Sequence, residues 1–111
     1  MLGTKLNGSV ITAGPLVIDR GAHRVAVAGK EIDLTATEFN LLLMLAERRG
    51  RVQSRSQLLE GVWKANPTIQ TRTVDMHMQR LRTKLGAASS LLETVRGFGY
   101  RFRSAVAPGS R

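Results

Sequence analysis

The sequence contains no cysteine, no long apolar run and few acidic residues. Without cysteine, the chain cannot form disulfides, a thiolate nucleophile or a cysteine-based metal site. Its longest apolar run, Leu41 to Ala46, is far shorter than the ~20 residues that a membrane-spanning helix needs. The first residues lack the apolar core of a secretory signal. We therefore expect a cytoplasmic protein that does not enter a membrane.

Acidic residues are outnumbered, since 8 Asp and Glu face 17 Lys and Arg and give a net charge of +9. Such an excess suits a polyanionic partner, either a nucleic acid or an anionic membrane surface. Residues 71–103 hold seven basic and two acidic residues, a net charge of +5. More than half of the net charge lies in under a third of the chain, which predicts a basic patch. A chain of 111 residues has the size of one domain.

The stretch Thr71–Leu85 predicts one helix with two chemically different faces. At ~100° per residue, a narrow apolar stripe is formed by Val74, Met78, Leu81 and Leu85. The other face has no acid and carries Arg72, Thr73, Met76, Gln79, Arg80 and Thr83. Arginine can bridge a guanine edge and glutamine an adenine edge. The helix thus has the groups to read DNA in the major groove, but an ordinary solvated helix face would show the same pattern.

The residues before this helix predict a sheet and two further helices. Short β-branched or alternating runs at 16–18, 24–28 and 32–34 indicate a three-stranded antiparallel meander. Two capping boxes start helices, one at Thr35 that runs to about Arg49 and one at Ser54 that runs to Trp63.

The residues after it predict a hairpin. Thr71 is a plausible N-cap of the 71–85 helix and Gly86 its stop. Strands at 92–96 and 100–103 flank Gly97-Phe98-Gly99, which supplies residues free to take positive φ. The whole pattern predicts an α+β winged helix-turn-helix. We expect 1–15 to be a linker or an extension derived from cloning, 16–103 the winged-helix domain, and 104–111 a disordered tail.

Three stretches then resemble a known family. LTATEFNLLLMLAERRGRVQSRSQLLEGVW, TRTVDMHMQRLRTKL and TVRGFGYRF together resemble the C-terminal DNA-binding effector domain of OmpR/PhoB-type two-component response regulators. The resemblance covers about 16–102. It implies an N-terminal antiparallel β-sheet of four strands, a three-helix core and a C-terminal β-hairpin wing. The pattern shows only three of those first strands, so a short fourth is expected.

The resemblance also implies roles for particular residues. It makes 71–85 the recognition helix, with groove-facing positions at Arg72, Thr73, Met76, Gln79, Arg80 and Thr83. It places Arg96 of the wing at the minor groove, and phosphate contacts at Trp63, Thr94 and Tyr100. Gln79 departs from the family, where a basic residue is common. Met76 fits either a thymine-methyl contact or a partly buried filler, and Trp63 fits a packing role better. Asp75, on the flank of the helix near Arg82, is expected to form a structural ion pair rather than to read DNA.

Expectations about partners follow from the same resemblance. Members bind direct repeats of double-stranded DNA as head-to-tail dimers, driven by a phosphorylated receiver domain. We expect this chain to be part of a larger regulator and a monomer in free solution. An alternative is a protein-interaction module that contacts RNA polymerase through the 64–70 loop. A second is non-specific binding of polyanions or of a membrane surface through the basic patch.

Catalysis, metal binding and a cofactor are not expected. His23 and His77 are the only histidines, and neither has the spacing of a metal site or a nucleophile–acid arrangement around it. Gly97-Phe98-Gly99 lacks the strand–loop–helix context of a phosphate-binding loop.

Overall fold

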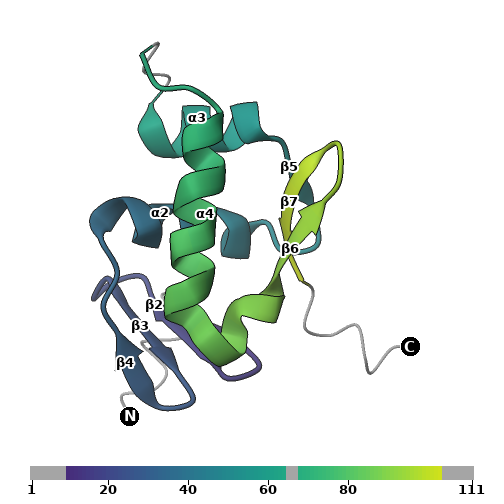
Figure 1. Ribbon diagram of the computed structural model, residues 1–111. Coiled ribbons are helices and arrows are strands. Elements are labelled where there is room, and N and C mark those ends of the chain that lie inside the picture. Colours follow the sequence, from purple (N-terminus) through teal and green to yellow (C-terminus); the bar gives the residue numbers. More distant parts are fainter. Residues whose placement is uncertain (1–9, 65–67, 104–111) are drawn as a thin grey trace.

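The computed structural model describes residues 10–64 and 68–103, which form two sheets and three α-helices (Figure 1). The predicted α+β winged helix-turn-helix is confirmed in its order of sheet, helices and terminal hairpin. Residues 1–9 of the predicted linker and the predicted tail at 104–111 lie outside the described residues. No described helix is long and apolar enough to cross a membrane.

The first sheet is an antiparallel meander with four strands in sequence order, β1 (Val10–Ala13), β2 (Leu16–Asp19), β3 (Arg24–Val27) and β4 (Lys30–Ile32). Leu16 pairs with Ala13 on one side and Val27 on the other, and all three are buried. The expected fourth strand is therefore β1, inside the stretch that we predicted to be a linker. It belongs to the domain because its inward-facing residues complete the buried face of the sheet.

The last strand of this meander also differs from the prediction. It covers Lys30–Ile32 rather than 32–34, because the chain turns tightly at Ala28-Gly29 with φ of 53° and 84°. Two successive positive φ values are those of a type I′ hairpin turn, which brings β4 into register directly after Gly29. Leu34 lies beyond the strand and packs against the core.

The three helices are α2 (Ala36–Glu47), α3 (Arg55–Trp63) and α4 (Arg72–Leu85). Both predicted capping boxes are present, at Thr35 with Glu38 and at Ser54 with Gln57. Helix α2 ends at Glu47, slightly before the predicted Arg49. Thr71 is the N-cap position of α4, but its side chain makes no capping hydrogen bond because its backbone is already helical.

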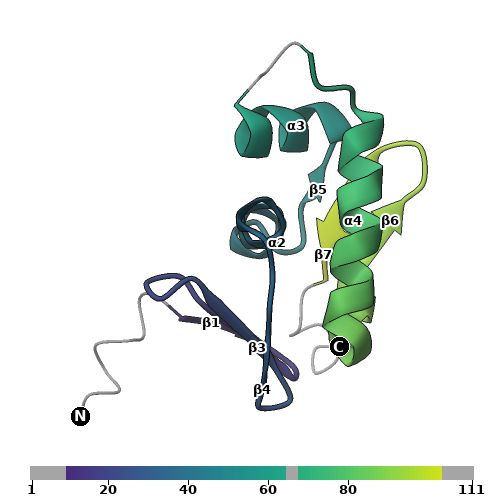
Figure 2. The same ribbon diagram turned by 60° about the vertical axis from the view of Figure 1, so that its left-hand side comes forward.

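Helix α2 lies at the centre of the molecule. Figure 2 views it end-on, with the first sheet on one side, α3 on the other and α4 alongside. Its Leu41, Leu42 and Leu45 are fully buried. This explains why α2 is apolar around most of its circumference, as a helix covered on several sides must be.

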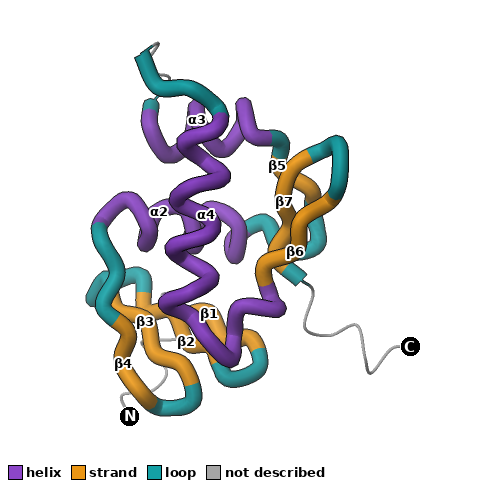
Figure 3. Tube along the Cα trace, viewed as in Figure 1, coloured by secondary structure: helices purple, strands orange, loops and turns teal. Residues whose placement is uncertain are grey.

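A second sheet of three strands joins the C-terminal hairpin to the rest of the domain (Figure 3). The strands are β5 (Val52–Gln53), β6 (Leu92–Val95) and β7 (Gly99–Phe102), in the order β5-β7-β6. A 3-10 helix, η2 (Gly86–Leu91), connects α4 to β6. The predicted hairpin is confirmed. Strand β5 was not predicted, because two residues are too few to show an alternating pattern.

Candidate nucleic-acid interface

Helix α4 separates the two faces that its sequence predicts. Its apolar stripe is buried, with at most 1% exposure at Val74, Met78, Leu81 and Leu85. The opposite face is open to solvent, and Figure 1 views α4 from this side with no other element in front of it. Thr73 is half-buried on this helix, and the other predicted groove-facing residues are exposed: Arg72, Met76, Gln79, Arg80 and Thr83. Met76 is 51% exposed and is therefore not a core filler.

The basic residues of the predicted patch fall into two groups. Four of the seven have partners within the protein: Arg82, Lys84, Arg101 and Arg103. Within residues 10–64 and 68–103, the other three make no hydrogen bond or ion pair: Arg72, Arg80 and Arg96. Most basic residues of the patch are thus used in contacts within the protein. The remaining positive charge is carried by these three guanidiniums on α4 and the hairpin.

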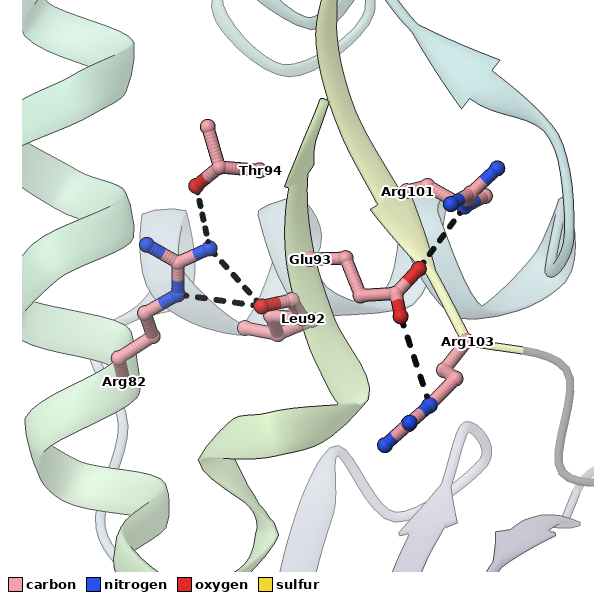
Figure 4. A network of polar contacts seen from close by, with 6 residues as sticks. All are labelled: Arg82, Leu92, Glu93, Thr94, Arg101 and Arg103. Atoms are coloured by element: carbon pink, nitrogen blue, oxygen red, sulfur yellow. Dashed lines mark hydrogen bonds and ion pairs between the residues drawn. The ribbon is translucent and has the colours of Figure 1, made fainter. Parts of the chain in front are cut away.

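Arg82 fastens the hairpin to α4. Its Nε and Nη2 donate to the Leu92 carbonyl at 3.2 and 2.8 Å, and Nη2 also donates to Thr94 Oγ1 at 2.8 Å (Figure 4). Because the Thr94 hydroxyl accepts this bond, its own proton remains available for an outside acceptor. Sequence reasoning did not assign this function to Arg82. The helical spacing places Arg82 on the flank of α4 but gives no information about strand β6.

The two strands of the hairpin are held together on their other side by a charged cluster. Glu93 accepts from Arg101 Nε at 2.9 Å and lies 3.4 Å from Arg103 Nε (Figure 4). The acid of the hairpin is therefore neutralised inside it. The hairpin presents Arg96 near its tip without a competing carboxylate among its described residues.

Asp75 links α4 to α3 and β7. Its Oδ1 accepts from Arg55 Nε at 2.8 Å and from the Tyr100 hydroxyl. Burial raises the pKa of Asp75, but the hydrogen bonds from Tyr100 and Arg55 outweigh it and hold the pKa below its ordinary value. The prediction of a structural ion pair is confirmed, and its partner, which the sequence did not give, is Arg55. Arg55 lies 20 residues away, a distance that helical spacing cannot address.

The same contact restricts Tyr100. Its side chain is 5% exposed, and its single hydroxyl proton is directed to Asp75. Burial and the neighbouring Asp75 carboxylate raise the pKa of Tyr100. The guanidinium carbons of Arg55 and Arg82 lie 5.5 and 5.6 Å from its ring centroid. A phosphate contact through this hydroxyl would require the bond to Asp75 to break.

Trp63 is half-buried at the end of α3. Its ring meets the ring of His77 edge-on, with centroids 5.1 Å apart. His77 Nδ1 lies 3.0 Å from the Thr73 carbonyl, which can only accept, so His77 serves the packing of α4. The other histidine, His23, stacks on Phe39. The described residues contain no group of three His, Asp or Glu that could hold a metal ion.

Glu38 fixes α4 against α2. It is 3% exposed, and its Oε1 accepts from Lys84 Nζ at 2.7 Å and from the Thr35 amide at 2.9 Å. Burial raises the pKa of Glu38, but the bonds from Lys84 and Thr35 outweigh it, so the pKa lies below its ordinary value.

A pH dependence follows from the lowered pKa of Glu38. This carboxylate stabilises the fold fully above its unfolded pKa, and the contribution is lost as pH falls through the lower folded pKa. Lys84→Met should reduce the free energy of unfolding by about 2 kcal/mol at pH 7, because a buried carboxylate loses its cation. It should also flatten the decline of stability between pH 5 and pH 3, as measured by urea unfolding. Lys30→Met, at an exposed position on β4, is the control, and an unchanged acid profile in Lys84→Met would contradict the assignment.

Comparisons with known proteins show which family has a sequence similar to this one. A family model described as "Transcriptional regulatory protein, C terminal" matches residues 29–102. The chain is 45% identical over 102 residues to the transcriptional regulatory protein CseB of Streptomyces coelicolor, and this alignment covers 92% of the chain and 43% of CseB. The chain therefore spans less than half of that relative.

Solved structures show the same fold. Response regulator DrrB, a Thermotoga maritima OmpR/PhoB homologue, matches with a TM-score of 0.78 and 33% identity over 86% of this chain and 45% of DrrB. The DNA-binding domain of Klebsiella pneumoniae RstA, solved in complex with the RstA box, matches with a TM-score of 0.75 and 31% identity over 85% of this chain and 96% of that one.

Proposed function

The chain belongs to the family of C-terminal transcriptional regulatory domains of OmpR/PhoB type, and from this premise we propose that it binds double-stranded DNA with sequence specificity. Helix α4 would lie in the major groove and the β6–β7 hairpin, the wing, at the adjacent minor groove. One observation carries the proposal: the exposed face of α4 holds guanidinium and amide groups that have no partner among the residues that the structure describes. The solved RstA complex supports it by analogy.

The exposed residues of α4 would each make a different contact with DNA. Arg80 lies in the middle of the helix and would bridge a guanine. Gln79 beside it would either read an adenine edge or, as a neutral side chain where relatives often have a basic one, lose a phosphate contact. Arg72, in the first turn, would reach a base or a phosphate. Met76 would contact a thymine methyl. Thr83 donates its hydroxyl proton to the Gln79 carbonyl at 3.1 Å, so it would act as an acceptor.

Contacts outside α4 would fix the position of the domain. Arg96 would enter the minor groove, where a narrow groove concentrates negative potential. Thr94 would donate to a phosphate, since its hydroxyl proton is not used by Arg82. We keep Trp63 and Tyr100 as proposed phosphate contacts of lower rank, because Trp63 packs on His77 and the Tyr100 proton is used by Asp75.

The wider setting is also a proposal. We infer that the chain works in the cytoplasm as the effector part of a two-component regulator with a receiver domain. Two copies would bind direct repeats head-to-tail while the free domain stays monomeric. A contact with RNA polymerase through the 64–70 loop is a proposal too, and residues 65–67 of that loop lie outside the described part of the chain. We propose no catalytic activity and no cofactor.

Selection of bound duplexes from a random pool tests the proposed function. A short repeated motif should enrich, and its duplex should bind far more tightly than a scrambled duplex in anisotropy titrations at two salt concentrations. The rival of non-specific polyanion binding expects no motif, equal loss of affinity with salt for both duplexes, and competition by anionic lipid vesicles. That outcome would overturn the base-reading function of Arg80 and Gln79.

A further inference from the structure

The loop of the wing carries an aromatic side chain that the proposed recognition does not use. Phe98 is 69% exposed, more than any other large hydrophobic residue in the described part of the chain. The other phenylalanines, Phe39 and Phe102, are at most 3% exposed. A single exposed hydrophobic residue is common on protein surfaces and proves nothing alone. Its position, however, places it beside the free cation of the wing.

A tight turn fixes Phe98 next to Arg96. The Phe98 amide donates to the Val95 carbonyl at 2.8 Å, and Gly97 between them has φ of 83°. A hydrogen-bonded turn with this φ at its third residue has the geometry of a type II turn. Arg96 and Phe98 are the second and fourth residues of that turn, and both are exposed. The turn therefore presents one cation and one aromatic ring together.

The strands that carry the tip are fastened to β5 and to α4. At its base, Gly99 lies so close to β5 that an added Cβ would be 2.1 Å from the Gln53 carbonyl oxygen. On its inner side, Arg82 holds β6 by the bonds to Leu92 and Thr94. Figure 2 shows the loop between β6 and β7 on the side of α4 that faces away from α2. The loop that contains Phe98 therefore lies on the side of α4 that is turned away from α2.

The chemistry of the tip fits the wall of a minor groove. The acid of the wing, Glu93, is held by Arg101 and Arg103, so the tip combines positive charge with an apolar ring. The minor groove combines negative potential with the apolar C–H surface of the deoxyriboses. An acidic protein partner could also pair with the charge of Arg96. Binding such a partner would not require the wing to be held in a fixed position beside α4.

We propose that Phe98 is a DNA-contacting residue, which packs its ring against the deoxyriboses of the minor groove beside Arg96. This inference rests on the proposed function. The ring adds an apolar contact to the charge of Arg96 and favours duplexes whose minor groove is narrow at that point. Phe98 thereby helps to determine specificity in the flank of the site, where α4 does not reach.

The test pairs protein variants with two duplexes. One duplex carries the selected site with its full flanks, and the other lacks the flank that the wing contacts. Phe98→Ala should bind the full duplex about tenfold more weakly than the wild type, since one large apolar contact is lost. It should bind the short duplex as the wild type does. Phe98→Leu should keep most of the affinity, and Val17→Ala, at an exposed apolar position on the first sheet, should keep all of it.

The outcomes separate this inference from the proposed function. If the wild type binds neither duplex specifically, the proposed function fails. If the wild type binds specifically and Phe98→Ala binds the full duplex equally well, Phe98 has no DNA contact and serves another purpose, such as a protein partner. An equal loss on both duplexes also overturns the proposal, because the effect would not come from the flank. Unchanged thermal melting of Phe98→Ala, expected for an exposed side chain, shows that the fold is intact.

Discussion

Gly99→Ala is expected to lower the free energy of unfolding by about 3 kcal/mol or more, an effect at the upper end for a single added methyl group. An added Cβ would be 2.1 Å from the Gln53 carbonyl oxygen and 2.8 Å from Ser54 Cα. These are backbone atoms of β5 and of the N-cap of α3, so they cannot move aside as a flexible side chain could. The φ of Gly99, 148°, adds strain for any residue with a Cβ.

Gly97→Ala is the matched control for Gly99→Ala. Gly97 also has a positive φ, 83°, but an added Cβ would meet nothing within 4 Å. Its cost should be limited to the backbone conformation, about 1 to 2 kcal/mol. Urea unfolding of both variants measures the difference. Equal losses would mean that the contact between β7 and β5 does not set the requirement for glycine at position 99.

Asp75→Ala should cost about 2 to 3 kcal/mol of stability, because it leaves a buried hydroxyl without its acceptor. The removed carboxylate connects Arg55 of α3, Tyr100 of β7 and the first turn of α4. Loss of this link should also loosen the wing relative to α4 and weaken specific DNA binding. Tyr100→Phe removes only the hydroxyl and should cost about 1 kcal/mol.

A double-mutant cycle tests the Asp75 link. In Tyr100→Phe, the additional change Asp75→Ala should cost less than it does in the wild type, since the hydroxyl that needs the acceptor is already gone. Urea unfolding of the four proteins gives the coupling energy. Strictly additive losses would show that the two side chains do not depend on each other, contrary to the structure.

The parts of the fold that the sequence predicts correctly are those with strong local patterns. Helices α2, α3 and α4 are long enough to show their period, and two of them begin with capping boxes at Thr35 and Ser54. The position of strand β1 and the existence of strand β5 were not predicted, for different reasons. The first is a four-residue strand in a segment rich in Gly, Ser and Thr, and the second is only two residues long.

In the candidate interface, too, local patterns predict some features and miss others. The exposed face of α4 follows from helical spacing alone, and Arg96 from its place beside a glycine turn. Contacts between distant segments were not predictable, because nothing in the sequence pairs Asp75 with Arg55 or Arg82 with the Leu92 carbonyl. The use of the Tyr100 hydroxyl by Asp75 is a consequence of the same tertiary packing. Local periodicity identifies which side chains face the solvent. It does not identify which of them already bond to another residue of the protein.

The central claim is that the exposed face of α4 reads base identity, and Arg80→Ala tests it most directly. The measurement is the affinity of the wild type and of Arg80→Ala for the selected duplex and for every single base-pair replacement within it. Arg24→Ala on β3, which removes an equal charge from the first sheet, is the control. We predict that Arg80→Ala loses about 1 to 3 kcal/mol of discrimination at one base pair and keeps discrimination at the others. A uniform loss at all positions, equal to that on a scrambled duplex, would contradict the claim and make Arg80 a purely electrostatic contact.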